Sequence, residues 1–196
     1  RLTAFAAYLK GGCHASATAI QAIFRDVLQL PISSGQIMKL LAKSSVALDE
    51  PYAELLRKLP AENRLNVDET GHKEQAKNWW TWVFRAAGFT LFRIKPSRGS
   101  EVLCDTLGRS FSGHLGSDFF SAYRKFLEES NALVQFCLAH LIRDLRFLSE
   151  GSDKVSANYG QRVLGALKRL FRVWHQRNEL GPDRFRKKLE SARDQA

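Results

Sequence analysis

The chain has few cysteines and no long hydrophobic run. Its 196 residues include only Cys13, Cys104 and Cys137. An odd, scattered set of cysteines argues against a disulfide framework and fits a reducing cytoplasm. No run of about 18 apolar residues occurs, so no membrane-spanning helix is expected. The first residues also lack the basic and apolar stretches of a secretory signal. We therefore predict a cytoplasmic protein.

Internal repeats and low-complexity linkers are also missing. Hydrophobic residues make up 44% of the chain, enough for a sizeable core. This length suits one domain, or one domain with a helical appendage. The chain begins with Arg1 and ends within a charged, helix-like stretch, so we expect it to be a fragment of a longer protein.

Acidic residues are in the minority. Lysines and arginines number 30 against 20 aspartates and glutamates, a formal net charge of +10. Residues 151–196 alone hold eleven lysines and arginines and five acidic residues. Such an excess favours a polyanionic partner, because each neutralised phosphate releases condensed counterions. Two interpretations stay open for this segment: nucleic-acid binding and a solvated basic helix surface.

The first 60 residues have helical patterns. Apolar residues recur at helical spacing between residues 17 and 28, and Pro31 breaks that run. Ser33 or Ser34 can cap the next helix, and residues 49–51 (Asp-Glu-Pro) predict a further helix start. Two short helices joined here would form a helix-turn-helix for a DNA groove. Plain helical packing is the interpretation we favour.

From Arg64 onward, strand patterns alternate with helical ones. The first three predicted strands form an antiparallel meander, with Gly88 between the second and third. After Gly151 only helical patterns continue. Strands are predicted at residues 65–68, 78–86, 89–94, 113–118 and 132–137, and helices at 100–107, 121–129, 140–148 and 154–196. We expect Ser100 to cap the first of these helices.

This order predicts an α/β protein with a mixed sheet flanked by helices. The ribonuclease-H-like fold has the same order of five strands, and in that fold the first and fourth strands lie side by side. We therefore predict a helical N-terminal region (residues 1–60), a ribonuclease-H-like catalytic core (61–150) and an incomplete helical insertion (151–196).

Asp68 and Asp118 each end a short apolar run, and the predicted fold would bring them together. Mg²⁺ prefers hard oxygen ligands, and two ions about 4 Å apart can promote in-line displacement at phosphorus. The pattern thus predicts a site for Mg²⁺ or Mn²⁺ at Asp68 and Asp118. Glu69 is expected to face away, because neighbouring strand residues point to opposite faces. The alternative for each aspartate is a helix cap or turn residue.

Cys137 and His140 are spaced like a Cys-x-x-His pair. Zinc would need two more ligands, so a buried thiol and a histidine near the active site or at a helix cap are favoured. Trp79, Trp80 and Trp82 are expected to be mainly core residues, with base stacking as the alternative. Alternation places Trp80 and Trp82 on one face of the strand and Trp79 on the other.

Several basic side chains are candidates for holding DNA phosphates. Each has a solvated surface position as its alternative. They are Arg98 and Arg109 beside the predicted sheet, and Lys168, Arg169 and Arg172 in the basic C-terminal segment.

Four motifs in order resemble the bacterial DDE transposases of the insertion-sequence-sixty-six family. They are residues 66–70 (Asn-Val-Asp-Glu-Thr), 80–83 (Trp-Thr-Trp-Val), 117–123 (Ser-Asp-Phe-Phe-Ser-Ala-Tyr) and 137–144, which begins Cys-Leu-Ala-His. The resemblance spans residues 1–150 and is strongest over 65–148. It implies that Asp68 and Asp118 are the first two catalytic acids.

Two features depart from the family pattern. Phe119 and Phe120 stand where the family commonly has glycine and tyrosine. The family also places a third acid, a glutamate, in an Asn-Asn-x-x-Glu-Arg signature after a helical insertion. Glu150, Glu179 and Glu190 lie outside any such signature. We therefore expect this chain alone to be inactive.

The resemblance implies an enzyme that hydrolyses a phosphodiester at the ends of its element. The freed 3′ hydroxyl then attacks target DNA. It further implies double-stranded DNA as partner, a homo-oligomer on DNA, possible accessory proteins and association with the bacterial nucleoid. The alternatives are a non-catalytic DNA-binding remnant and another ribonuclease-H-like nuclease such as a resolvase.

Overall fold

Three helices form the N-terminal region of the computed structural model, which describes residues 1–194. They are α1 (Leu2–Gly11), α2 (Ala17–Asp26) and α3 (Ser34–Lys58). The Ser33 hydroxyl caps α3 by accepting a hydrogen bond from the Gln36 amide at 3.2 Å. A small core of their own joins the three helices: Ala6, Leu9, Ile20, Phe24 and Ile37.

The predicted helix start at residues 49–51 is wrong. α3 continues through Pro51 and runs for 25 residues. Proline in a helix interior removes one backbone hydrogen bond, but the two ends of α3 pack on different cores. Ile37 belongs to the N-terminal core, whereas Leu55 and Leu56 pack against the sheet core. Packing at both ends thus outweighs the lost hydrogen bond.

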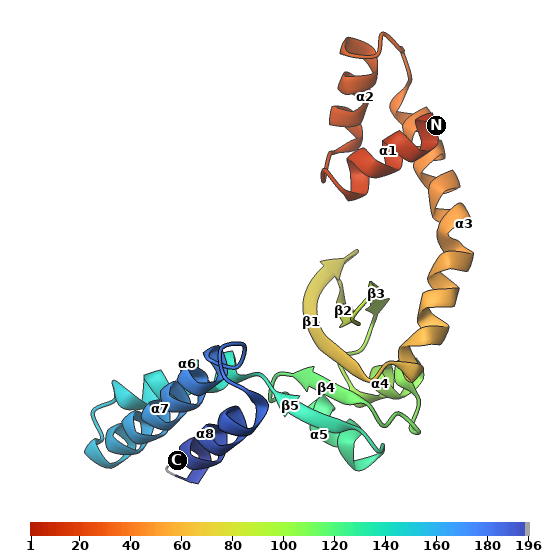
Figure 1. Cartoon of the computed structure of the whole chain (residues 1–196). Coiled ribbons are helices and arrows are strands. Elements are labelled where there is room, and N and C mark those ends of the chain that lie inside the picture. Colours follow the sequence, from red (N-terminus) through yellow and green to blue (C-terminus); the bar gives the residue numbers. More distant parts are fainter. Residues whose placement is uncertain (195–196) are drawn as a thin grey trace.

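Five strands form one mixed sheet in the order β3-β2-β1-β4-β5. β2 runs antiparallel to β1 and β3, while β4 runs parallel to β1 and β5. This confirms the predicted meander and the ribonuclease-H-like fold, with the first and fourth strands adjacent (Figure 1). The strands are β1 (Arg64–Glu74), β2 (Lys77–Arg85), β3 (Thr90–Lys95), β4 (His114–Ser117) and β5 (Leu133–Phe136).

The β1–β2 hairpin is longer than predicted. β1 continues to Glu74, well past the predicted end at Asp68, and pairs with β2 along its length. The hairpin turns at Gln75 and Ala76, which have φ angles of 48° and 63°. Both angles lie in the left-handed region that two-residue hairpin turns require. Gln-Ala lacks the usual Asn-Gly signal, so the sequence pattern did not reveal this turn.

One face of the sheet packs on α4 (Ser100–Leu107) and α5 (Ser121–Glu128). Inward residues alternate along the strands, such as Leu65 and Val67 on β1 and Trp82 and Phe84 on β2. Trp80 packs against the same core, which confirms that Trp80 and Trp82 share a face. The predicted cap at Ser100 is wrong by one residue, because Gly99 occupies the N-cap position of α4.

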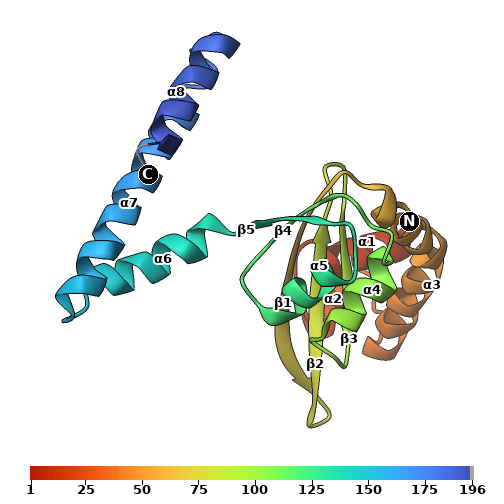
Figure 2. The same ribbon diagram turned by 90° about the horizontal axis from the view of Figure 1, so that it is seen from below.

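Three further helices follow β5, and they extend away from the sheet (Figures 1 and 2). They are α6 (Leu138–Ser149), α7 (Lys154–His175) and α8 (Pro182–Asp194). Asp153 caps α7 by accepting from the Ser156 amide at 2.9 Å. Among the described helices, none is both long and apolar enough to cross a membrane.

Candidate active site

Asp68 lies on β1, and Asp118 directly follows the adjacent parallel strand β4. The β1–β4 register pairs Leu65 with Leu115 and Asn66 with Gly116. Asp68 comes two residues after Asn66, and Asp118 comes two residues after Gly116. Because side chains alternate between faces, both aspartates belong to the face opposite the buried Leu65 and Leu115. The fold therefore brings together two acids that lie fifty positions apart in the sequence.

Both aspartates line one cavity of about 440 Å³ at the end of the sheet. Cys137 and His140 at the start of α6 contribute to its wall, and Phe171 of α7 reaches it as well. Gly116 forms part of the floor, where the Asn66 side-chain amide lies so close that a Cβ would collide with its Oδ1. A larger residue at this position would displace the Asn66 side chain from β4.

The two carboxylates are held by local backbone hydrogen bonds. Oδ1 of Asp68 accepts from the Glu69 amide at 2.9 Å, and Oδ1 of Asp118 accepts from the Phe120 amide at 2.9 Å. Within residues 1–194 neither aspartate forms an ion pair. Two carboxylates on one cavity wall are the hard oxygen donors that Mg²⁺ and Mn²⁺ take, so the residues present fit a divalent cation.

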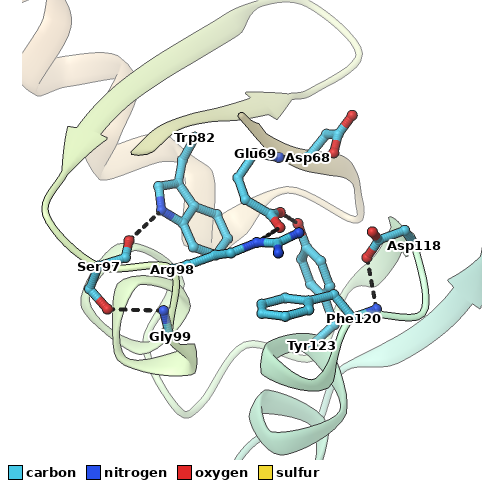
Figure 3. Close-up of polar contacts among 9 residues, drawn as sticks. All are labelled: Asp68, Glu69, Trp82, Ser97, Arg98, Gly99, Asp118, Phe120 and Tyr123. Carbon is cyan, nitrogen blue, oxygen red and sulfur yellow. Dashed lines mark hydrogen bonds and ion pairs between the residues drawn. The ribbon is translucent and has the colours of Figure 1, made fainter. Parts of the chain in front are cut away.

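Glu69 points to the other face of β1, as expected (Figure 3). Its side chain is only 1% exposed and pairs with Nε of Arg98 at 2.8 Å. The hydroxyl of buried Tyr123, in the first turn of α5, donates to the second Glu69 oxygen. We call these three residues, Glu69, Arg98 and Tyr123, the Glu69 cluster. Both oxygens of Glu69 are thus engaged on the core side of the sheet, away from the cavity.

The Arg98 guanidinium lies between two aromatic rings. Its central carbon is 3.7 Å from the centroid of Phe120 and 4.7 Å from that of Trp80. A cation over an aromatic face is favourable, and more so where water is excluded. The loop before Arg98 is anchored by Trp82, whose indole N–H donates to the Ser97 carbonyl at 3.1 Å. Arg98 therefore joins β2, the β3–α4 loop and the turn after β4.

Burial sets the protonation tendencies of this cluster. Desolvation raises the pKa of Glu69, although the hydrogen bonds from Tyr123 and Arg98 oppose that rise. The negative charge of Asp118 adds to it. Burial also raises the pKa of the Tyr123 hydroxyl, and the adjacent Glu69 carboxylate adds to that rise. Tyr123 consequently remains a hydrogen-bond donor at neutral pH.

Cys137 occupies the N-cap position of α6, beside the cavity, and is only partly buried, so the predicted buried position in the strand is wrong. Hydrogen bonding to His140, from its side chain and its backbone, lowers the pKa of the Cys137 thiol. Nδ1 of His140 is buried and has no hydrogen-bond partner of normal length among the described residues. The His140 side chain makes the largest contribution to the lowered pKa of the Cys137 thiol, and the backbone amides of Ala139 and His140 add to it.

The predicted phosphate-binding residues occupy different environments. Arg98 is engaged inside the Glu69 cluster, and Arg109 is 72% exposed with Glu129 at 3.4 Å. On α7, Lys168 and Arg172 are exposed one turn apart, while Arg169 is partly buried. Phe171, between them, lines the cavity of the aspartates. This part of α7 is thus a basic surface next to the candidate site.

Over residues 1–194, no group of three or more His, Cys, Asp or Glu side chains is arranged to hold a metal ion. Glu150 and Glu179 are exposed and lie outside the aspartate cavity. Within the described residues, the two aspartates are therefore the acids that the fold gathers at this cavity.

The Glu69 cluster is the feature that the sequence analysis missed. Arg98 is separated from Glu69 by 29 positions and Tyr123 by 54. One signal was present, because alternation along β1 places Glu69 on the buried face with Leu65 and Val67. A buried carboxylate requires a cation and hydrogen-bond donors, so the need for partners was predictable, although their identity was not.

Comparisons with solved structures return retroviral integrases at low similarity. The HTLV-2 integrase catalytic core domain in complex with magnesium, in its trimeric form, is 16% identical, with a TM-score of 0.30. The match covers 56% of this chain and 87% of the integrase chain. A chain of a simian T-cell lymphotropic virus intasome in complex with PP2A regulatory subunit B56 gamma is 15% identical, with a TM-score of 0.32. The match covers 95% of this chain and 66% of that chain. TM-scores this low do not support an inference about chemistry.

Among curated proteins, none matches the chain. The family described as the transposase IS66 family matches over residues 1–196, the whole length. That match agrees with the order of the four motifs and with the sheet topology. The chain belongs to the IS66 family of transposases and is a DDE transposase sequence with a ribonuclease-H-like fold.

Proposed function

We propose that Asp68 and Asp118 are catalytic acids that hold a divalent cation for phosphodiester chemistry on DNA. One observation carries this proposal: in a member of a transposase family, two distant aspartates, Asp68 on β1 and Asp118 directly after the adjacent parallel strand β4, line one cavity. When bound there, Mg²⁺ or Mn²⁺ would supply Lewis-acid stabilisation for an in-line displacement at phosphorus. The two carboxylates supply negative charge at the cavity, and a backbone amide holds one oxygen of each in place.

In this proposal the complete enzyme binds the element's double-stranded ends as an oligomer, hydrolyses a phosphodiester there and joins the freed 3′ hydroxyl to target DNA. The basic surface of α7 at Lys168 and Arg172 supports DNA contact, because it borders the cavity through Phe171. We retain the division into residues 1–60, 61–150 and 151–196. The separate cores of the N-terminal helices and the sheet support the first boundary.

We also propose that this chain alone does not cleave DNA, since the aspartate cavity gathers two acids and the family site uses three. The test combines Mn²⁺ binding, followed by electron paramagnetic resonance, with nicking of supercoiled plasmid. The chain should bind Mn²⁺ weakly, Asp68→Asn and Asp118→Asn should each remove that binding, and nicking should stay at background. Mn²⁺ binding unchanged by both substitutions would overturn the site, and strong nicking by the wild-type chain would overturn its inactivity.

A further inference from the structure

The Glu69 cluster connects the two chain segments that carry the aspartates. Glu69 follows Asp68 directly on β1. Tyr123 lies in the first turn of α5, and Phe120, which stacks on Arg98, belongs to the turn that begins with Asp118. Figure 3 shows the cluster between these two segments. Its contacts run from β1 through Arg98 and Tyr123 to the chain that holds Asp118.

Each contact restricts one of the two segments. The ion pair and the Tyr123 hydrogen bond hold the Glu69 side chain, and thereby the backbone that carries Asp68. On the other segment, the Phe120 amide donates to Asp118 while the Phe120 ring lies against Arg98. Tyr123 also packs edge-on against the fully buried Trp82, with 6.2 Å between ring centroids. A shift of either segment would break contacts on both sides.

The cluster also keeps the charge of Glu69 apart from the charges of the two aspartates at the cavity. Glu69 is a third carboxylate close to Asp118, and it lies where water cannot solvate it. Arg98 neutralises it on the core side, so its charge is balanced by a protein cation. The two remaining carboxylates are left to face the cavity without an ion pair within residues 1–194.

We propose that Glu69, Arg98 and Tyr123 are positioning residues that set the relative placement of Asp68 and Asp118 for cation binding. None of them touches the cation or DNA in this role; they act through the backbone of β1 and of the turn after β4. The inference rests on the proposed function of the two aspartates.

The test is Mn²⁺ affinity of the 196-residue chain and of its Tyr123→Phe and Glu69→Gln variants. Tyr123→Phe removes only the hydroxyl that donates to Glu69. Its Mn²⁺ affinity should fall on the order of 10-fold, the lower end of the loss seen when a group bonded directly to a metal ligand is removed, because Tyr123 acts on Asp68 through Glu69 and the backbone. Glu69→Gln, which leaves Arg98 without its carboxylate, should lower the affinity at least as much. Circular dichroism and thermal unfolding verify that each variant is folded at the temperature of the measurement.

Tyr52→Phe is the matched control, because it removes a tyrosine hydroxyl that donates to the Phe92 carbonyl at 3.1 Å on β3. Its Mn²⁺ affinity should equal that of the wild type. A folded Tyr123→Phe variant with wild-type Mn²⁺ affinity would overturn the positioning role while leaving the metal site intact. If Asp68→Asn also kept its Mn²⁺ affinity, the metal site itself would be wrong, and the positioning role would fall with it.

Discussion

The two faces of the sheet at Asp68 and Glu69 of β1 provide opposite environments for a carboxylate. On the core face, Glu69 is buried and satisfied by a cation and a hydroxyl. On the cavity face, Asp68 is exposed and accepts a hydrogen bond from the backbone. Adjacent residues on one strand thus have opposite environments, because strand side chains alternate. The contacts that neutralise a carboxylate therefore lie on the core face, whereas Asp68 on the cavity face forms no ion pair within residues 1–194.

The largest expected effect comes from the cavity face. In the full-length enzyme, Asp68→Asn should lower strand transfer on the order of 10³-fold or more, because Lewis-acid stabilisation of the transition state is worth several kcal/mol. DNA binding should remain, since the substitution leaves the basic surface of α7 intact. A strand-transfer assay with labelled element ends checks the activity, and a gel-shift assay checks the binding. Near-normal transfer would refute the role of Asp68.

The second prediction concerns the core face. Arg98→Met should destabilise the chain by about 2–3 kcal/mol, because it leaves the Glu69 carboxylate buried without its cation. This is below the loss expected for a fully buried pair, since the Arg98 side chain is 37% exposed. Urea unfolding followed by tryptophan fluorescence measures the change.

Glu129→Gln supplies the control for that measurement. It breaks the Arg109–Glu129 pair, in which Arg109 is 72% exposed, and should cost less than about 1 kcal/mol. Equal losses for the two substitutions would mean that the core-face ion pair has no special weight.

The smallest expected effect lies at the cavity wall. In a Cys13→Ser, Cys104→Ser background, alkylation by iodoacetamide reports on Cys137 alone. Because its thiol pKa is lowered, the alkylation rate should reach its plateau at a lower pH than for an ordinary cysteine. His140→Ala removes the side-chain part of that effect, so the profile should move to higher pH. An unchanged profile in His140→Ala would assign the effect to the helix start alone.

Much of the fold followed from local patterns. Alternation and turn residues predicted the five strands and their meander, and helical spacing predicted the helices after the sheet. The errors have a common cause. The helix start at residues 49–51 and the short β1 were inferred from local signals, yet α3 and the β1–β2 hairpin are extended by packing and pairing with distant segments.

In the candidate site, too, local patterns predicted some features and missed others. The motifs were sufficient to propose Asp68 and Asp118, although the predicted strand end at Asp68 is wrong. Alternation was sufficient to predict that the Glu69 side chain faces away from the cavity. Arg98 was selected for its charge as a DNA contact, whereas the structure places its guanidinium between Phe120 and Trp80. Charge in a sequence does not reveal whether a side chain will meet phosphate or an internal carboxylate.

The sequence by itself determined which residues face inward along each strand, since that depends only on a two-residue period. Motifs that are local also indicated the family and predicted its first two acids. Only the tertiary structure decided which distant segments meet: β1 with β4, α7 with the aspartate cavity, and Arg98 and Tyr123 with Glu69. The physical reason is that burial of a charge demands a partner but leaves its position in the chain open, and packing of the whole core selects it.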